Sequence, residues 1–230
     1  MTESLAALVP MKEHSDRVPN KLDRNFNGRP LFHWILNTLE ATRVVDEIVV
    51  NTDSKEIATS AREQFEVTVV ERPDHLRGDE VSMNKIILHD VRQIDHEQFL
   101  QTHCTNPLLR PETIEEAVER FRTVECYSLF SVTPVRSRIW STDCVPVNHE
   151  RDRLLPTQEL DPLYEENSNI YLFTQTSVES RGNRIGDDPQ MYEIKEQEAI
   201  DIDYPIDFSI AESLHRDRYG EEPPLSKVVD

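Results

Sequence analysis

LVPMKEHSDRVPNK, residues 8–21, joins an apolar pattern typical of a strand to a polar loop. The apolar pattern begins at Ala6 and helical periodicity follows from Pro30, so the segment is the loop of a strand–loop–helix unit. The loop carries three cations, Lys12, Arg17 and Lys21. Lys and Arg neutralise phosphate oxygens and backbone N–H groups add donors, which favours a polyphosphate cradle at the carboxyl end of the first strand. The alternative is a solvated loop whose charges bind nothing.

The composition is strongly acidic. A chain of 230 residues suits one fairly large domain or two small ones and can bury a proper core. Only 37% of the residues are hydrophobic, and the formal net charge is −19. Nucleic acid and anionic membranes both require a basic surface, so we expect neither as a partner. Abundant Asp and Glu with scarce Lys indicate a high-salt cytoplasm, in which a hydrated acidic surface keeps a protein dissolved. We therefore expect a halophilic protein.

Three cysteines, Cys104, Cys126 and Cys144, show neither a CxxC pair nor metal-ligand spacing. We expect reduced thiols, as in cytosolic proteins. The first residues lack the basic and apolar regions of a signal peptide, and no run of about 18 apolar residues is present. The sequence thus predicts a cytoplasmic protein without a transmembrane helix.

Strand-like and helix-like patterns alternate along the first 133 residues. After the first strand, we expect strands at 44–51, 67–70, 98–101 and 127–133, and helices at 30–41, 55–64, 83–92 and 111–121. A strand at 168–174, a short helix at 176–180, a strand at 191–194 and a helix at 205–215 follow. The alternation predicts a single three-layer α/β/α domain, residues 1–230, with an open and mostly parallel sheet.

Residues 134–166 interrupt this alternation. They are rich in Pro, Asp and Arg, and they contain only weak strand signals. A long irregular insert in a compact domain usually carries function or forms an interface. We expect the insert to do one or both.

A pair of carboxylates, in Asp201-Ile202-Asp203, precedes the final helix that Pro205 begins. With the two-residue period of a strand, both carboxylates lie on one face. Two carboxylates beside a bound phosphate can hold Mg²⁺. The alternative is a strand end at which Asp203 caps the helix. In combination with a cationic phosphate loop, the metal site is the better interpretation for at least one of the two.

Two further polar stretches lie beside predicted strands. Residues 101–110, QTHCTNPLLR, follow a strand end, where open α/β sheets place ligand contacts. His103 and Cys104 are neighbours there, but adjacent residues of an extended chain point in opposite directions, which favours a packed thiol over a catalytic pair. Residues 163–171, LYEENSNIY, combine aromatic, amide and carboxylate groups that suit a sugar. A solvated turn is the alternative for this stretch.

In their order, the motifs resemble the acylneuraminate cytidylyltransferase family, the CMP-sialic acid synthetases and their keto-deoxyoctulosonate relatives. The set is S-x-x-x-P-x-K, G-x-P-L, IVVNTDS, ERP, Q-T-x-x-T-N-P-L-L-R-P-E-T, E-N-x-x-I-Y and D-I-D, across residues 5–212. Each motif alone is weak, whereas the ordered set is specific. The resemblance implies a nucleotide-diphospho-sugar-transferase-like fold and Mg²⁺-dependent transfer of CMP from CTP to a 2-keto-3-deoxy sugar acid, with release of pyrophosphate.

The resemblance also assigns residues. The catalytic cations match Lys12 and Lys21, and Arg17 replaces a family Lys that lies one residue earlier. The implied nucleotide contacts are Met11, Ser15, Arg72 and Gln101. The implied metal ligands are Asp201 and Asp203. For the sugar acid we expect Gln158, Tyr164, Glu166 and Asn167.

One departure from the family concerns the sugar. A family Arg before the E-N-x-x-I-Y motif matches Thr157, which leaves Arg136, Arg138 or Gln158 for the substrate carboxylate. Because the family uses the insert as a dimer contact, we expect a homodimer in which residues 134–166 also complete the sugar site. Two rivals remain: a nucleotidyltransferase for another sugar or nucleoside triphosphate, and a non-catalytic nucleotide-sugar-binding relative.

Overall fold

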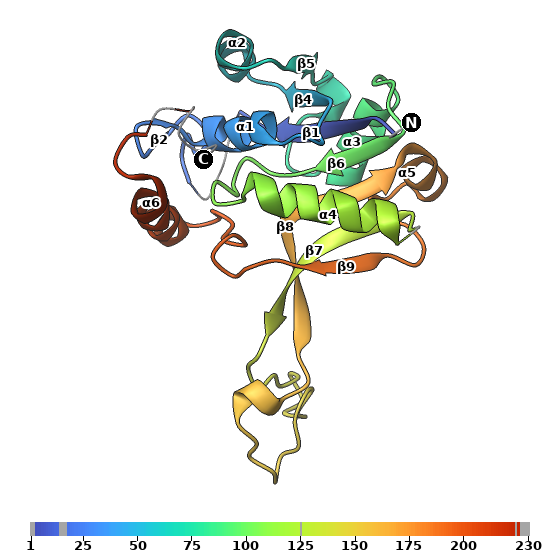
Figure 1. The fold of residues 1–230 in the computed structure, drawn as a ribbon, viewed down its shortest axis with the longest axis vertical. Coiled ribbons are helices and arrows are strands. Elements are labelled where there is room, and N and C mark those ends of the chain that lie inside the picture. Colours follow the sequence, from blue (N-terminus) through green and yellow to red (C-terminus); the bar gives the residue numbers. More distant parts are fainter. Residues whose placement is uncertain (1–2, 14–17, 125, 224, 226–230) are drawn as a thin grey trace.

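The computed structural model describes residues 3–13, 18–124, 126–223 and 225. Its main strands are β1 Leu5–Met11, β4 Glu47–Thr52, β5 Thr68–Glu71, β6 Gln98–Gln101, β7 Ser128–Val135, β8 Leu163–Thr174 and β9 Gln190–Glu193. They form one seven-stranded sheet in the order β5-β4-β1-β6-β8-β7-β9 (Figure 1). β8 runs antiparallel to both neighbours, and the other neighbouring pairs are parallel. The mostly parallel sheet is therefore confirmed.

Helices cover both faces of this sheet. They are α1 Leu31–Ala41, α2 Lys55–Gln64, α3 Met83–Val91, α4 Pro111–Thr123, α5 Gln175–Arg181 and α6 Pro205–Tyr219, with short 3₁₀ helices at Asp74–Leu76 and Thr157–Glu159. Along β1, Leu5, Ala7 and Val9 pack in the cluster of α1, α2 and α4. Ala6 and Leu8 face α3 and α5 instead. This alternation confirms the three layers. Within the described ranges, no helix has the length and apolar character needed to cross a membrane.

Several predicted boundaries are confirmed, and two predictions about strands need correction. The helix at 55–64 and the strand at 98–101 have the predicted limits. β4 begins at Glu47 rather than at residue 44. Just before it, the Asp46 carboxylate accepts the Leu5 N–H at 2.8 Å, and the Asp46 N–H donates to the Leu5 carbonyl at 2.9 Å. The Leu5 N–H is therefore bound by a side chain rather than by a residue of a longer strand. The strand expected at 201–203 is wrong: this segment forms no strand and lies outside the sheet.

An Asn–Gly turn leads into α1. β2 Asn25–Phe26 and β3 Arg29–Pro30 form a small antiparallel hairpin. Its two loop residues, Asn27 and Gly28, have φ angles of +46° and +92°. Asn and Gly tolerate this left-handed region better than other residues, which explains their presence in two-residue hairpin loops. The Asn27 N–H donates to Glu212 at 2.9 Å, so the hairpin also holds α6 in place.

The insert is not irregular at its two ends, contrary to the prediction. β7 and β8 continue as a paired ribbon from Val132↔Glu166 to Val135↔Leu163. Residues 132–166, here called the arm, project from the body of the molecule (Figure 1). The weak strand signals at its ends are thus explained by a two-stranded ribbon with little core to bury.

Candidate functional site

A cavity of about 670 Å³ lies at the carboxyl ends of β1 and β6, beside the start of α3. Ligands of open α/β sheets bind at this edge. Six of the predicted site residues line it: Met11, Lys12, Lys21, Arg72, Asp201 and Asp203. Ser15 and Arg17 lie outside the described residues. The cavity therefore brings together the first loop and the Asp-Ile-Asp segment, which are about 180 residues apart in the sequence.

The two lysines of the first loop hold different positions at the cavity. Lys12 is half exposed, and its Nζ lies 2.6 Å from Asp79 Oδ1 in the loop before α3. The hydrogen bond and charge of Lys12 lower the pKa of the Asp79 carboxyl. Lys21 is largely buried, donates to the Ile202 carbonyl at 2.6 Å and lies 3.8 Å from Asp203 Oδ1. Lys21 thus ties the first loop directly to the acidic segment.

The acidic segment is fixed by backbone contacts rather than by a sheet. The N–H of Ile202 donates to Thr105 O at 3.0 Å, and the Ile202 side chain is fully buried. Asp201 and Asp203 both line the cavity, so the expected shared face is present without a strand. Asp203 does not provide the cap of α6: the Asp207 carboxylate accepts the N–H groups of Asp203 and Tyr204 at 3.1 and 2.7 Å.

Asp201 meets the chemical requirement for a metal ligand. Its Oδ2 accepts a hydrogen bond from Ser168 Oγ at 2.8 Å. Its Oδ1 is buried and has no hydrogen-bond partner among the described residues. The described residues contain no group of three or more His, Cys, Asp or Glu side chains that could hold a metal ion by themselves. Two carboxylates fit Mg²⁺, which proteins often bind through one or two carboxylates together with substrate phosphates.

Arg72 is buried and fixed by the ends of two strands. Its Nε donates to Asn51 Oδ1 at 2.7 Å, and its Nη2 donates to Met11 O at 2.9 Å and Asn51 O at 3.1 Å. Burial lowers the pKa of Arg72, and the charges of Asp53 and Asp90 oppose this shift. The guanidinium thus joins β1 to β4 and at the same time borders the cavity.

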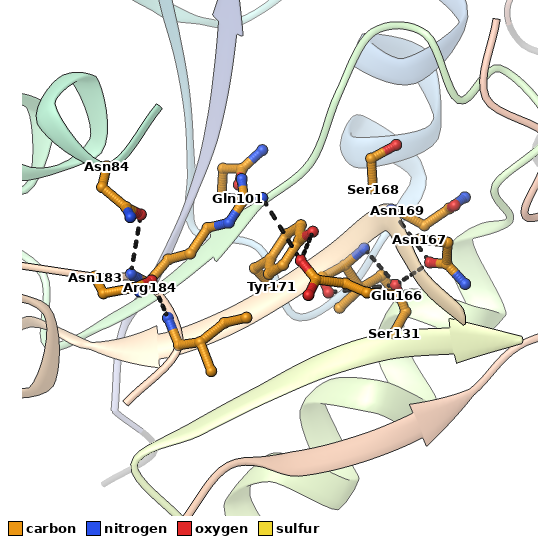
Figure 2. Close-up of polar contacts among 12 residues, drawn as sticks. Asn84, Gln101, Ser131, Glu166, Asn167, Ser168, Asn169, Tyr171, Asn183 and Arg184 are labelled. Carbon is orange, nitrogen blue, oxygen red and sulfur yellow. Dashed lines mark hydrogen bonds and ion pairs between the residues drawn. The ribbon is translucent and has the colours of Figure 1, made fainter. Parts of the chain in front are cut away.

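Gln101 lies beneath a second arginine, Arg184, whose side chain is largely buried. It is fully buried, its Oε1 accepts a hydrogen bond from Arg184, and its Nε2 donates to Thr102 O at 3.1 Å. Arg184 lies over the ring of Tyr171, with its Cζ 3.5 Å from the ring centroid. The Tyr171 hydroxyl donates to Glu166 at 2.6 Å, as Figure 2 shows. Gln101 and Glu166, two predicted site residues, therefore belong to one cluster at the base of the arm.

A large irregularity in β8 sets the orientation of the E-N-S-N residues. The register passes from Phe130↔Tyr171 to Val132↔Glu166, so Ser131 alone faces residues 167–170. Ser131 Oγ donates to Asn167 Oδ1 and accepts the Ile170 N–H at 2.9 Å (Figure 2). Bulges commonly redirect side chains at functional sites. Here the bulge directs Ser168 towards Asp201 and places Asn167 in a structural role.

Gln158 and Tyr164 do not line this cavity. Both are exposed and belong to the arm, Gln158 in its 3₁₀ helix and Tyr164 on the paired part of β8. Their assignment to the sugar acid stays a prediction.

His103 and Cys104 both line the cavity, although adjacent residues of a strand would point apart. The chain leaves β6 at Gln101 and turns at Cys104, which removes the strand geometry. Burial raises the pKa of the Cys104 thiol to about 12, so this side chain is the packed thiol that the sequence favours. All three cysteines are free. Burial, with the charges of Arg184 and Lys21, lowers the pKa of His103 to about 3, so its imidazole is neutral.

Three residues of this site are absent from the sequence-based selection: Asp79, Ser168 and Arg184. Ser168 lies inside the E-N-x-x-I-Y motif, so the motif itself was the available signal. Arg184 follows α5 in the loop that returns to the sheet, and nothing in its sequence neighbourhood indicates that it contacts Gln101. Asp79 is one of many acidic residues, and only the fold brings it to Lys12.

Comparison with known proteins identifies relatives across nearly the whole chain. The family model described as cytidylyltransferase matches residues 6–223. A Legionella pneumophila protein, CMP-N,N'-diacetyllegionaminic acid synthase, is 29% identical over 226 residues, which cover 91% of this chain and 95% of that protein. N-acylneuraminate cytidylyltransferase A of Danio rerio is 25% identical over 229 residues, 96% of this chain but 53% of that protein. The chain thus spans about half the length of the fish protein.

The fold has a counterpart among solved structures. A CMP:2-keto-3-deoxy-manno-octonic acid synthetase complexed with CTP matches with a TM-score of 0.71 at 11% identity, over 94% of this chain and 99% of that one. This similarity confirms the expected nucleotide-diphospho-sugar-transferase-like fold. The match of the family model to residues 6–223 establishes the relationship itself: the chain belongs to the cytidylyltransferase family.

Proposed function

We propose that this protein transfers CMP from CTP to a nonulosonic acid and releases pyrophosphate. The observation that carries the proposal is one cavity in which the two lysines of the first loop meet Asp201 and Asp203. The names of the Legionella and fish relatives, which refer to legionaminic and acylneuraminic acids, support this class of acceptor. The reaction needs cations for a triphosphate and carboxylates for a metal, and the cavity offers both.

In the proposed reaction, the anomeric hydroxyl oxygen of the sugar attacks the α-phosphorus of CTP. The new O–P bond forms as the bond from the α-phosphorus to the oxygen shared with the β-phosphate breaks. Pyrophosphate leaves with the bonding electron pair, and the proton of the hydroxyl is released to solvent. Negative charge on the phosphoryl oxygens is stabilised by fixed cations in such reactions. Lys21 is suited to this task because its side chain is 11% exposed and already held by Ile202.

We assign Mg²⁺ to Asp201 and Asp203. Ser168 donates to Asp201 Oδ2, which orients the carboxylate and leaves the buried Oδ1 available for an ion. Lys21, 3.8 Å from Asp203, keeps a compensating positive charge beside the pair. When bound, Mg²⁺ neutralises phosphate charge and polarises phosphoryl oxygens.

The proposal includes a homodimer formed through the arm. The arm carries large apolar side chains on its surface, Trp140, Val145, Val147, Leu154, Leu163 and Tyr164. A second copy would cover them, and Gln158 and Tyr164 would then reach the cavity of the partner. Light scattering of the purified protein should give twice the 26.8 kDa chain mass, and a monomer at micromolar concentration would contradict the dimer.

Pyrophosphate release tests the proposed function. The assay supplies Mg²⁺, one nucleoside triphosphate and one acid: N-acetylneuraminic acid, N,N'-diacetyllegionaminic acid or 2-keto-3-deoxy-manno-octonic acid. We expect release with CTP and a nine-carbon acid, and little with ATP, GTP or UTP. Comparable release with another triphosphate would contradict the nucleotide assignment. Binding of CTP without release for every acid would indicate a non-catalytic relative.

A further inference from the structure

Arg184 is a largely buried cation that the proposed reaction does not yet use. It lies between α5 and β9, and its backbone N–H donates to Asn84 Oδ1 at 3.2 Å. Its side chain is 17% exposed and stacks on Tyr171, with one donor bonded to Gln101 Oε1. These contacts hold the guanidinium in one place at the base of the arm (Figure 2). A fixed guanidinium can bind a planar anion with two parallel hydrogen bonds.

The positive charge of Arg184 is only partly compensated within the described residues. The nearest carboxylate, Glu166, has its Oε1 4.0 Å from Arg184 Nη2, which is beyond hydrogen-bond length. That oxygen already accepts the Tyr171 hydroxyl at 2.6 Å. Burial lowers the pKa of Arg184, which reflects the cost of an incompletely paired charge. An anionic group of a ligand would remove this cost.

Arg72, the buried arginine at the ends of β1 and β4, provides a contrast to Arg184. Arg72 donates from Nε and Nη2 to Asn51 and Met11, so its donors join strands of the protein itself. Within the described residues, the Arg184 guanidinium instead hydrogen-bonds to two side chains, those of Gln101 and Tyr171. Of these two arginines, Arg184 is therefore the better placed for a ligand carboxylate.

The position of Arg184 in the sheet separates it from the phosphate-binding cations. Lys12 follows β1 and Arg72 follows β5, whereas Arg184 lies over Gln101 of β6 and Tyr171 of β8. In the strand order β5-β4-β1-β6-β8, this is the side from which the arm extends. The charge of Arg184 acts on His103, which lines the cavity, and Asn84 follows the cavity residue Met83. Arg184 does not line the cavity itself but lies close to two residues that do, on the side of the arm.

We propose that Arg184 binds the carboxylate of the sugar acid and thereby determines that the acceptor is an acid. This inference rests on the proposed function. It competes with the arm residues Arg136, Arg138 and Gln158, the candidates from the sequence. Of these, Arg138 donates to Leu155 O at 2.6 Å within the arm itself. Tyr171 and Gln101 are positioning residues, because they fix the guanidinium by stacking and by a hydrogen bond.

A comparison of acid and amide acceptors tests the assignment. Pyrophosphate release is measured with N,N'-diacetyllegionaminic acid and with its C1 carboxamide, for the wild type, Arg184→Met and Arg181→Met. Arg181 is the matched control, because it is half exposed and pairs with Asp187 on the surface. We expect Arg184→Met to raise the KM for the acid about tenfold or more, since hydrogen bonds to charged groups contribute that much. Its KM for the carboxamide and its CTP affinity should stay near wild type.

The acid-to-amide preference distinguishes a ligand contact from a structural role. The wild type and Arg181→Met should prefer the acid strongly, and Arg184→Met should accept both alike. Loss of kcat with an unchanged preference would overturn the assignment. If Arg184→Met does not fold, the same comparison is made with Arg184→Lys. We expect this variant to have a weaker preference for the acid than the wild type, because lysine cannot form two parallel hydrogen bonds with a carboxylate. A preference equal to that of the wild type would contradict recognition by two such bonds. A wild type that binds CTP but releases no pyrophosphate with any acid contradicts the proposed function, and this assignment with it.

Discussion

At the scale of single residues, Asn27 fixes the tautomer of His215. Its Nδ2 lies 2.9 Å from both Gly220 O and His215 Nδ1, and its Oδ1 accepts the Glu222 N–H at 3.0 Å. Since these backbone groups determine which end of the amide is the donor, Nδ1 of His215 is an acceptor and its proton resides on Nε2. Protonation of Nδ1 would break this hydrogen bond inside the packing of α6.

We predict that His215 makes the protein less stable as the pH falls from about 6.5 to about 4. Burial, together with the charge of Arg218, lowers the pKa of His215 from 6.5 to about 4. Between these values the unfolded chain binds a proton that the native state does not, so the free energy of unfolding falls by about 1.4 kcal/mol per pH unit at most. Urea unfolding at two pH values within this window, compared with neutral pH, measures the slope.

The matched variants are His215→Gln, which removes the titrating group, and His75→Gln on the exposed 3₁₀ helix. His215→Gln should be less stable at neutral pH but should lose less stability on acidification. His75→Gln should follow the wild type. His33, whose pKa burial also lowers to about 4, contributes in the same direction in all three proteins. Parallel slopes for His215→Gln and wild type would refute the assignment to His215.

Residues with rare chemistry in this sequence could be predicted, and residues defined by contacts could not. Lys12 and Lys21 stand out because cations are unexpected in the first loop of a chain with a net charge of −19. Asp201 and Asp203 stand out through their spacing before Pro205. Arg184 gives no such signal, because its significance depends on the β6–β8 pairing that brings Gln101 opposite Tyr171.

At the scale of elements, the bulge of β8 links the sheet to the metal site. Ser131 fills it and satisfies both the Asn167 amide oxygen and the Ile170 N–H. Ser168, the residue after Asn167, then hydrogen-bonds through its hydroxyl to both Asn106 and Asp201, at 3.1 and 2.8 Å. The conformation of Asp201 therefore depends on a hydroxyl in the neighbouring strand that never touches the cavity.

We predict that Ser131→Ala lowers the free energy of unfolding by about 1–3 kcal/mol, because it leaves the buried Ile170 N–H without its partner and leaves the Asn167 amide oxygen with only the Asn169 N–H at 3.4 Å. It should also weaken Mg²⁺ dependence, since Ser168 loses its fixed position. The control is Ser209→Ala on the exposed face of α6, with a change below about 0.5 kcal/mol. Denaturant unfolding measures both variants. Equal stability of Ser131→Ala and wild type would contradict this role.

Elements with strong periodicity were predictable, and elements held by single contacts were not. α2 and β6 have the predicted limits because amphipathic and buried patterns define them locally. The segment 201–203 has the alternation of a strand, but its partners are the Thr105 carbonyl and Lys21 rather than another strand. The ribbon of the arm lacks apolar alternation because little of the ribbon is buried in the chain itself.

At the scale of the whole molecule, the negative charge determines how stability and activity depend on salt. The formal net charge of −19 makes acidic side chains repel one another, and dissolved salt screens this repulsion. We predict that the melting temperature and pyrophosphate release both increase from about 0.1 M to about 2 M KCl. CTP affinity should move in the opposite direction, because salt also weakens the contacts of Lys12 and Lys21 with phosphate.

Thermal unfolding and the pyrophosphate assay across this KCl range provide the measurement. Sucrose at matched osmolality is the control, because it lacks the screening effect of ions. Full stability and full activity in dilute buffer, with no gain from KCl, would contradict the halophilic interpretation.

The central claim is that Asp201 and Asp203 bind the metal that serves CTP in this cavity. The most direct test is Mg²⁺-dependent pyrophosphate release by Asp203→Asn, with Asp217→Asn on the exposed face of α6 as control. Asp203→Asn should lose about 100-fold or more in rate and keep its free energy of unfolding, because removal of one catalytic electrostatic contact costs that much. Asp217→Asn should match wild type. A wild-type rate and Mg²⁺ dependence in Asp203→Asn would contradict the account.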